Sequence, residues 1–388
     1  MSFDPDRPFN DLPDLPPDLS FIETSEMFRQ IVLAHRSLAE LKGYCQTLPN
    51  PELLLNAVIL QEGKDSSEIE NIVTTQDELF RAAAANDTRK AMDAIPAPAK
   101  EVLRYREAVY SGWDALRTTG LLTTNTFVQI VQRLKQNTAG IRTSQVVIGN
   151  PATEAVIYTP PEGEALLRDK LGALEVFMHA GDDSAANIDP LIRMALAHYQ
   201  LEAIHPFYDG NGRTGRILNV LYLMQQGLLD SPVLYLSAYV LGRKTDYYRL
   251  LRGVTERGEW ADWVSYMLEA VQATSHATLG LIRDVNALLE KLAETAKSGM
   301  KNGYSRDLIR LIFHQPYCKI QFVVEEGLAS RVTASRYLAD LERLGVLRSL
   351  QVHREKYFIN YRLLDLLASF RPRYDALSVA SIKHGHTD

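Results

Sequence analysis

The sequence predicts a mainly α-helical protein with a short β-hairpin near its middle and a smaller domain at its C-terminal end. Apolar residues recur at helical spacing from Phe21 onward. Runs of β-branched residues, which favour strands, are confined to a few short stretches, and a polar stretch with two glycines separates the last part of the chain near residue 300. At 388 residues, 46% of them apolar, the chain is long enough for two or three domains.

An N-terminal region is expected over residues 1–95. Residues 1–20 are rich in proline and aspartate, so they predict an extended arm that lies over the body or stays mobile. An apolar face at helical spacing over 53–60 predicts a helix that Gly63 interrupts. A second, short helix is expected over 66–73.

A helical main domain is expected over residues 96–296, because the two prolines within Ala94–Ala99 are typical of a boundary. Asp189 followed by Pro190 indicates a helix start, since aspartate caps a helix and proline fits its first turn. Gly227 indicates a helix end. The elements predicted in this domain are helices over 100–116, 124–135, 190–204, 211–226 and 260–296, and a β-hairpin formed by 144–149 and 155–159.

A polar, glycine-containing linker is expected over 297–303, followed by a third domain over 304–388. Three helices followed by a β-hairpin resemble a winged helix-turn-helix. The elements predicted in this domain are helices over 308–313, 320–326 and 332–344, and strands over 346–352 and 356–360.

The net charge of −6 is unevenly distributed. Residues 301–388 hold 14 Lys and Arg against 9 Asp and Glu, a net of +5, which leaves −11 for the rest of the chain. This domain therefore has two open interpretations: DNA binding, or docking to a protein, including a second copy of the chain. The DNA-binding residues would lie at the start of the third helix and on the wing: Arg331, Thr333, Ser335, Arg336, His353, Arg354 and Lys356.

The two cysteines and the lack of long apolar runs limit the class of protein. Cys45 and Cys318 lie far apart without a second thiol nearby, which predicts two buried, reduced thiols instead of a disulfide framework or a zinc cluster. No apolar run has the length that a bilayer requires, and residues 1–20 do not resemble an export signal. We therefore expect a cytoplasmic protein that does not bind membranes.

The segment His205–Arg216, HPFYDGNGRTGR, predicts an anion-binding site at the start of a helix. Gly210, Asn211 and Gly212 stand where the helix begins, so free backbone N–H groups and the positive end of the helix dipole point to one place. Arg213 and Arg216 are three residues apart on the same helix and could clamp successive phosphates.

Two further side chains add chemistry to this anion site. Asp209 supplies a hard oxygen ligand of the kind that a phosphate-bound magnesium ion requires. His205 can change its protonation near neutral pH and could take a proton from an attacking hydroxyl group. The residues alone therefore predict a phosphate site with a neighbouring general base.

His205–Arg216 is similar in every fixed position to the motif of the Fic family, H-P-F-x-[D/E]-G-N-G-R-x-x-R. The resemblance implies a helical Fic fold and an enzyme that transfers AMP from ATP to Tyr, Ser or Thr hydroxyl groups of proteins, including itself. Because the chain keeps Gly-Asn-Gly-Arg, which family members that act as kinases lack, AMP transfer is favoured over phosphoryl transfer.

The resemblance also implies roles for single residues. His205, Asn211 and Arg216 would be catalytic, Asp209 would hold Mg²⁺, and Phe207 would anchor the loop in the core. The residues expected to bind ATP are Glu70, His205, Gly210, Asn211, Gly212, Arg213, Thr214, Gly215, Arg216 and Tyr248.

The hairpin near 144–159 resembles the family's flap, to whose edge a target protein adds as an extra strand. The alternative is an ordinary surface hairpin. Tyr248 falls where relatives place an aromatic group near the adenine, but a tyrosine at a helical position can equally belong to the core.

Residues 66–71, SSEIEN, are similar to the inhibitory motif [S/T]-x-x-x-E-[G/N] of many Fic proteins, which implies regulatory roles for Ser66, Glu70 and Asn71. Glu70 would pair with Arg216 and thereby misplace the γ-phosphate, so Glu70→Gly should raise AMP transfer several-fold. The alternative is a capping box formed by Ser67 and Glu70. Removal of AMP from modified proteins is a secondary expectation, and a transcription regulator that only senses nucleotide is the competing function.

Overall fold

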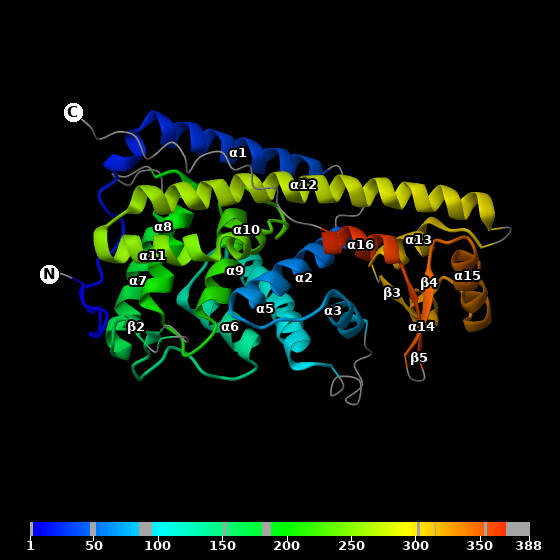
Figure 1. Cartoon of the computed structure of the whole chain (residues 1–388), viewed down its shortest axis with the longest axis horizontal. Helices are drawn as coiled ribbons and strands as arrows, with labels where there is room; N and C mark the ends of the chain where they lie inside the picture. The colour runs from blue at the N-terminus through cyan, green and yellow to red at the C-terminus, as the bar shows by residue number, and fades with distance from the viewer. Residues whose placement is uncertain are drawn as a thin grey trace.

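The computed structural model describes residues 3–46, 52–84, 95–149, 153, 155–180, 188–300, 303–314, 316–352 and 355–369. This part of the chain is mainly helical, as predicted, and forms an elongated molecule (Figure 1). A single helix, α12 (Trp260–Gly299), runs along most of its length, and α1 (Ser25–Gln46) packs beside it. The short hairpin lies at one end and the C-terminal domain at the other.

Helix α8 (Pro190–Ile204) lies at the centre of the main domain and is buried on nearly all sides. Asp189 caps it as predicted, because its carboxylate accepts a hydrogen bond of 2.8 Å from the N–H of Leu191. The other helices of this domain are α5 (Ala97–Thr119), α6 (Thr124–Lys135), α7 (Glu164–His179), α9 (Asn211–Gln225), α10 (Leu236–Gly242) and α11 (Lys244–Arg257).

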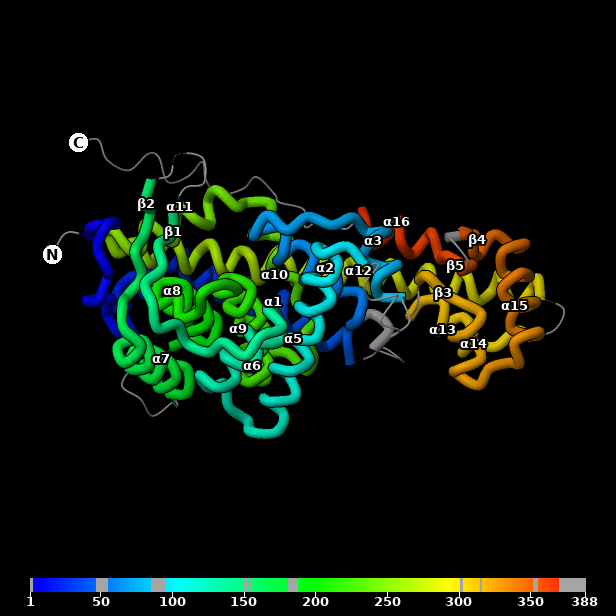
Figure 2. The backbone as a smooth tube through the Cα atoms, turned by 90° about the horizontal axis from the view of Figure 1, so that it is seen from below, coloured from blue at the N-terminus to red at the C-terminus, as the bar shows by residue number. Residues whose placement is uncertain are grey.

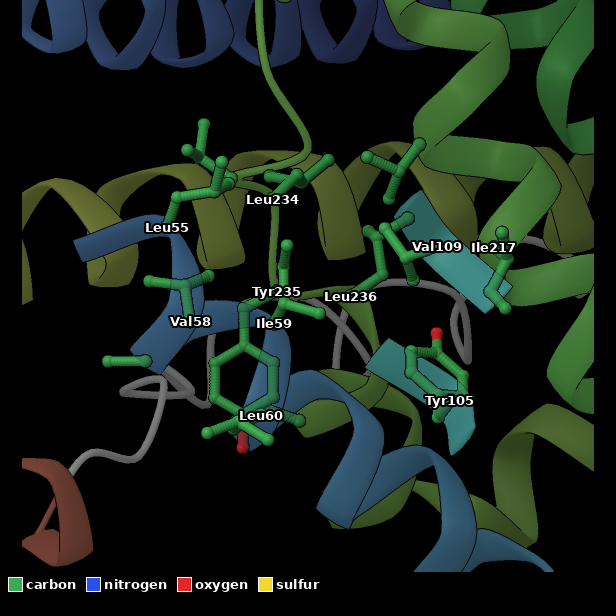
Figure 3. Close-up of a cluster of buried hydrophobic side chains, with 14 of the residues drawn as sticks. Leu55, Val58, Ile59, Leu60, Tyr105, Val109, Ile217, Leu234, Tyr235 and Leu236 are labelled. Carbon is green, nitrogen blue, oxygen red and sulfur yellow. The ribbon is translucent and has the colours of Figure 1, made fainter. Parts of the chain in front are cut away.

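Helix α2 (Glu52–Ile69) corrects the prediction of a helix that Gly63 interrupts and of a separate helix over 66–73. The helix continues through Gly63, where an added Cβ would lie 2.9 Å from Cδ1 of Tyr105. Gly63 therefore allows close packing against α5. Apolar side chains of four helices and of the segment before α10 form a buried cluster (Figure 3), which includes Leu55, Val58, Ile59, Leu60, Tyr105, Val109, Ile217, Leu234, Tyr235 and Leu236.

Polar contacts also hold α2 in the core. The Glu62 carboxylate accepts hydrogen bonds from the N–H of Ser237, at 2.9 Å, and from the hydroxyl group of Ser237, at 2.5 Å. The hydroxyl group of Tyr235 donates to Asp65. Because buried carboxylates are stable only when they are hydrogen bonded, these contacts fix the position of α2 against α10.

The predicted β-hairpin is present but short. Strand β1 (Ile148–Gly149) pairs antiparallel with β2 (Val156–Tyr158), with Ile148 opposite Tyr158. Figure 2 shows the hairpin at the same end of the molecule as α8 and α11. The described part of the N-terminal arm lies over the body, since the N–H of Phe9 donates to the carbonyl of Thr159 at 3.0 Å and Leu12 is buried.

The C-terminal domain has the three predicted helices followed by a hairpin, and two elements that the sequence analysis missed. The missed elements are strand β3 (Tyr317–Cys318) and helix α16 (Tyr361–Ser369). The others are α13 (Arg306–His314), α14 (Ile320–Glu325), α15 (Arg331–Arg343), β4 (Arg348–Val352) and β5 (Glu355–Ile359), and the antiparallel sheet has the strand order β3-β5-β4.

The C-terminal domain packs against the helices of the main domain instead of being joined to it only by the predicted linker. Residues 297–299, predicted to belong to the linker, form the last turn of α12. Helix α16 contacts α12, and the side chain amide of Gln61 on α2 donates to the carbonyl of Leu367 at 3.2 Å. Of the predicted wing residues, His353 and Arg354 lie outside the described residues.

The remaining described elements are a 3₁₀ turn (Ser20–Glu23) and α3 (Gln76–Ala83), which a capping box of Thr75 and Glu78 starts. Both cysteines are free thiols. Cys318 is buried as predicted, but Cys45 is only partly buried, and burial raises their pKa values to about 12 and about 11. None of the described helices has the length and apolar character needed to cross a membrane.

Candidate active site

The loop between α8 and α9 places His205 at the mouth of a helix. His205 ends α8 in the left-handed conformation, with φ 48°, so the chain turns sharply there. Phe207 is buried and anchors the loop. The side chain of Asn211 closes the turn, because it accepts a hydrogen bond of 2.9 Å from the N–H of Phe207 and donates one of 2.8 Å to the carbonyl of Phe207.

Helix α9 begins at Asn211, directly after Gly210, which has φ 89°. Its first helical hydrogen bond runs from the N–H of Thr214 to the carbonyl of Gly210. The N–H groups of the first turn therefore have no helical acceptor and point out of the helix mouth, where an anion would bind. The side chains of Asn211, Arg213 and Thr214 are buried around it.

The His205 ring can act as a base at neutral pH. Its Nδ1 lies 3.3 Å from the carbonyl of Glu202 and donates to it, which leaves the lone pair of Nε2 free to accept a proton. Burial lowers the pKa of His205 to about 4. The sequence predicted a change of protonation near neutral pH, but with this lowered pKa the ring is already neutral there, which suits a general base.

Arg216 is held by Ser66 in the last turn of α2 and by Glu70, which directly follows that helix. Its Nε donates to the hydroxyl group of Ser66 at 2.8 Å, and one terminal nitrogen donates to the carbonyl of Ser66 at 2.9 Å and to Oε1 of Glu70 at 2.8 Å. The side chain of Arg216 is 2% exposed. Burial opposes its charge, but the negative charge of Glu70 outweighs this effect and keeps the pKa of Arg216 above its usual value.

The carboxylate of Glu70 also covers the start of α9. A Cβ added to Gly212 would lie 2.5 Å from Oε1 of Glu70, so this oxygen lies directly over the backbone of the helix mouth. Glu70 therefore occupies part of the space where an anion would bind at the start of α9, and it also pairs with Arg216.

The end of α2 explains why the residue after Glu70 is asparagine. Asn71 has φ 62°, its N–H donates to the carbonyl of Glu68, and the N–H of Ile72 donates to the carbonyl of Ser67. These two bonds form a Schellman motif, whose left-handed position glycine and asparagine tolerate best. Since Ser67 lies in the last turn of α2, the alternative of a capping box that starts a helix at Ser67 is wrong.

Arg213 and Asp209 lie on a different side of the loop from Arg216. Arg213 pairs with Glu101 of α5 at 2.6 Å and with Asp209 at 3.4 Å, while Nζ of Lys135 lies 2.5 Å from Asp209. Burial alone would raise the pKa of Asp209. The hydrogen bond and the charge of Lys135 outweigh burial and lower the pKa below its usual value, so the carboxyl stays ionised. The structure therefore does not bring Arg213 and Arg216 together as a clamp, and a shared phosphate role for them stays a prediction.

A cavity of about 420 Å³ lies between the hairpin, α8, α9 and α11. Its polar side includes Glu70, His205 and Arg216, and its apolar side includes Ile148, Ile157 and Leu251. Tyr248 lines it and is 46% exposed, whereas Tyr247 is buried and bonded to His198 at 2.8 Å. Tyr248 thus faces the cavity, as its predicted role requires.

Two residues near this cavity escaped the sequence analysis. Glu202 lines it, and its Oε1 has no hydrogen-bond partner among the described residues. Burial raises its pKa to about 7. Because Glu202 precedes His205 by three residues on one helix, helical spacing could have indicated it. Arg142 contacts the loop from 63 residues away, and no local pattern could have revealed this.

Three family models match successive parts of the chain. Residues 28–114 match the Fic/DOC family N-terminal model, and residues 121–223 match the Fic/DOC family model. Residues 288–363 match the C-terminal domain of SoFic-like protein adenylyltransferases.

Curated relatives match a part of the chain. The protein adenylyltransferase fic-1 of Caenorhabditis elegans is 32% identical over 143 residues, which is 37% of this chain and 25% of that protein. A probable protein adenylyltransferase of Aquifex aeolicus is 28% identical over 159 residues, 36% of this chain and 47% of that protein. The chain thus spans a quarter to a half of these relatives.

Solved structures support the fold. A Fic family protein from Desulfovibrio desulfuricans G20 superposes with a TM-score of 0.51 at 18% identity, covering 85% of this chain and 95% of that one. Fic-1 from C. elegans superposes with a TM-score of 0.50 at 21% identity, covering 67% of this chain and 75% of that one.

Proposed function

Since the chain belongs to the Fic/DOC family, we propose that it transfers AMP from ATP to a hydroxyl group of a protein. The observation that carries the proposal is the His205 ring, with its Nε2 unengaged, beside the first-turn N–H groups of α9 in one cavity. The helix mouth would hold the phosphates, and Nε2 of His205 would take the proton of the attacking hydroxyl group. The oxygen would attack the α-phosphorus, and pyrophosphate would leave.

Asp209 fits a role as the protein ligand of a magnesium ion on the phosphates. Its carboxylate is 60% exposed and directly precedes the cap of α9. One carboxylate is enough, because Mg²⁺ in such sites takes its other oxygen ligands from phosphates and water. The ion would neutralise charge on the triphosphate.

The hairpin of β1 and β2 would present the protein substrate. It forms one wall of the cavity that contains His205, and Val147 and Ile157 are exposed on it. A target segment that pairs with the hairpin by backbone hydrogen bonds would bring its hydroxyl group to the base without much reading of its side chains.

We further propose that Glu70 inhibits the transfer. Through its contacts with Arg216 and the start of α9, it would compete with the γ-phosphate and leave ATP in an unproductive orientation. The same carboxylate could position water for the reverse removal of AMP, which the recovery of AMP from a purified modified protein would test.

Parallel incubation with α-labelled and γ-labelled ATP tests the main proposal. Protein labelling is expected from α-labelled ATP alone, because only the α-phosphate stays on the acceptor. Label from γ-labelled ATP would instead indicate phosphoryl transfer. Tight binding of ATP without any labelling in the Glu70→Gly variant would favour a nucleotide-sensing regulator.

Tyr248→Ala is expected to raise the KM for ATP several-fold with little change in kcat, because a ring that stacks on the adenine binds the ground state and the transition state alike. Tyr248→Phe keeps the ring and is the matched control. Steady-state labelling rates over a range of ATP concentrations give both constants. Equal KM values for the alanine and phenylalanine variants would remove Tyr248 from the adenine site.

A further inference from the structure

Arg142 connects the catalytic loop with both ends of the hairpin segment. Its guanidinium donates three hydrogen bonds, all to backbone carbonyl oxygens: Nε to His205 at 2.8 Å, and the two terminal nitrogens to Ser144 at 3.1 Å and to Pro161 at 2.5 Å. Its backbone N–H donates to the carbonyl of Pro206 at 2.9 Å. The residue is 1% exposed.

The environment of this arginine is unusual for a buried charge. A buried guanidinium is normally paired with a carboxylate, but Arg142 forms no ion pair with a carboxylate of the described residues, and Glu162 acts on it only through its charge. Burial lowers its pKa. The three carbonyl dipoles therefore stabilise the charge, and the planar, forked shape of the group lets it bind three separate segments at once.

Neighbouring contacts connect the same segments. The hydroxyl group of Tyr208 accepts a hydrogen bond of 3.0 Å from the N–H of Thr143, directly after Arg142. On the other strand, the hydroxyl group of Tyr158 donates to the carbonyl of Ala203 at 2.7 Å. Both limbs of the hairpin segment are thus bonded to the stretch that contains His205, with Arg142 between them.

We infer that Arg142 is a positioning residue that holds His205 and the hairpin in one fixed relation, so that an acceptor presented by the hairpin meets the base. This inference rests on the proposed function. The physical reason is that proton transfer requires heavy atoms within hydrogen-bond reach, and a displacement of about 1 Å can lower a rate by about 10²-fold. Among the described residues, Arg142 is the only buried cation that donates hydrogen bonds both to the stretch that contains His205 and to the hairpin segment.

Two substitutions separate the geometry of Arg142 from its charge. In a Glu70→Gly parent, Arg142→Lys keeps the charge but loses the fork, and Arg142→Met loses both. Each is expected to lower labelling from α-labelled ATP about tenfold at saturating ATP, while the Kd of α,β-methylene ATP, measured by calorimetry, changes less than about twofold.

The pH profile distinguishes the two variants. The charged and titratable groups around His205 are Arg142, Glu70 and Asp209, and Glu202 and Arg216 line the same cavity, so both variants are compared in a Glu202→Gln background. The charge of Arg142 helps burial to keep the pKa of His205 low. The acid limb of the rate profile should therefore move to higher pH in Arg142→Met and stay in place in Arg142→Lys. A residue that only stabilises the fold would move neither limb.

Arg193→Lys is the matched control. Arg193 is also a buried arginine that donates to a backbone carbonyl, that of Ala180, but it lies at the start of α8 beside the ring of Phe177. Arg193→Lys should have the labelling rate of the parent and the same acid limb of the pH–rate profile, with a melting temperature similar to that of Arg142→Lys.

Hydrogen exchange gives a readout that does not depend on catalysis. Amide exchange over residues 143–149 should become faster in Arg142→Lys and stay unchanged in Arg193→Lys. Parent-like exchange and parent-like labelling in Arg142→Lys would overturn the inference. A parent that takes up no α-label, while Arg142→Lys still loosens the hairpin, would instead count against the proposed function.

Discussion

Alanine in place of His205 is expected to lower AMP transfer by about 10²- to 10⁴-fold, the range that a positioned general base contributes. The structure offers a physical reason, since the ring lines the cavity, Nδ1 is engaged by the carbonyl of Glu202, and Nε2 is left to accept a proton. The measurement is the initial rate of labelling from α-labelled ATP at saturating ATP, in the Glu70→Gly parent.

His276→Ala is the control for this substitution, because His276 lies exposed on α12 and bonds to Ser37, away from the cavity. It should label at the parent's rate. Binding of α,β-methylene ATP should survive His205→Ala, which would separate lost catalysis from lost binding. Undiminished labelling in His205→Ala would refute the proposed role of the ring.

The pH dependence of the same rate follows from the lowered pKa of His205. Because the pKa is about 4, the ring is unprotonated at and above pH 5, and the rate should fall only as the pH approaches 4. An ordinary histidine would lose half of its base form near pH 6.5. The carboxyl of Glu202 titrates at about 7 in the same cavity, so the profile should be repeated with Glu202→Gln to separate the two groups.

The sequence predicted the parts of this site whose contacts join residues close together in the chain, and it missed the contacts between distant segments. The contacts of the segment His205–Arg216 are local. The turn at the glycines, the burial of Phe207 and the start of α9 depend on residues that are neighbours in the sequence. The helix start at Asp189 was correct for the same reason. Glu70 was placed near Arg216 by the resemblance, and the ion pair is present in the structure.

Contacts between distant segments explain the errors. Gly63 suggested a break because its low helix propensity was weighed without the ring of Tyr105 that packs on it. Arg213 and Arg216 share a helix, but Glu101 of α5 and Ser66 of α2 hold them in separate surroundings. Helix α16 was missed although Leu363 and Leu367 are spaced as on one helical face, and both are buried where α16 contacts α12.

Glu70→Gly is expected to raise AMP transfer on the order of ten- to a hundredfold, more than the several-fold rise that the motif alone suggested. The estimate follows from the contact that is lost, because a hydrogen bond between charged groups contributes about 1.5–3 kcal/mol and each 1.4 kcal/mol is a factor of ten. The bond to Arg216 is 2.8 Å long, and the arginine is buried. Removing the carboxylate frees both the guanidinium and the mouth of α9 for the phosphates.

Helix α2 itself should stay in place in this variant, since Glu62 and Asp65 still bind Ser237 and Tyr235 and Ser66 still binds Arg216. Glu68→Gly is the matched control: it removes the same charge two residues earlier, in the last turn of α2, where the carboxylate pairs with Lys64. Glu70→Gln keeps the size of the side chain and should activate to an intermediate level. Equal labelling by Glu70→Gly, Glu68→Gly and the unaltered chain, at matched ATP and magnesium, would show that the Glu70 contact is structural and does not limit the reaction.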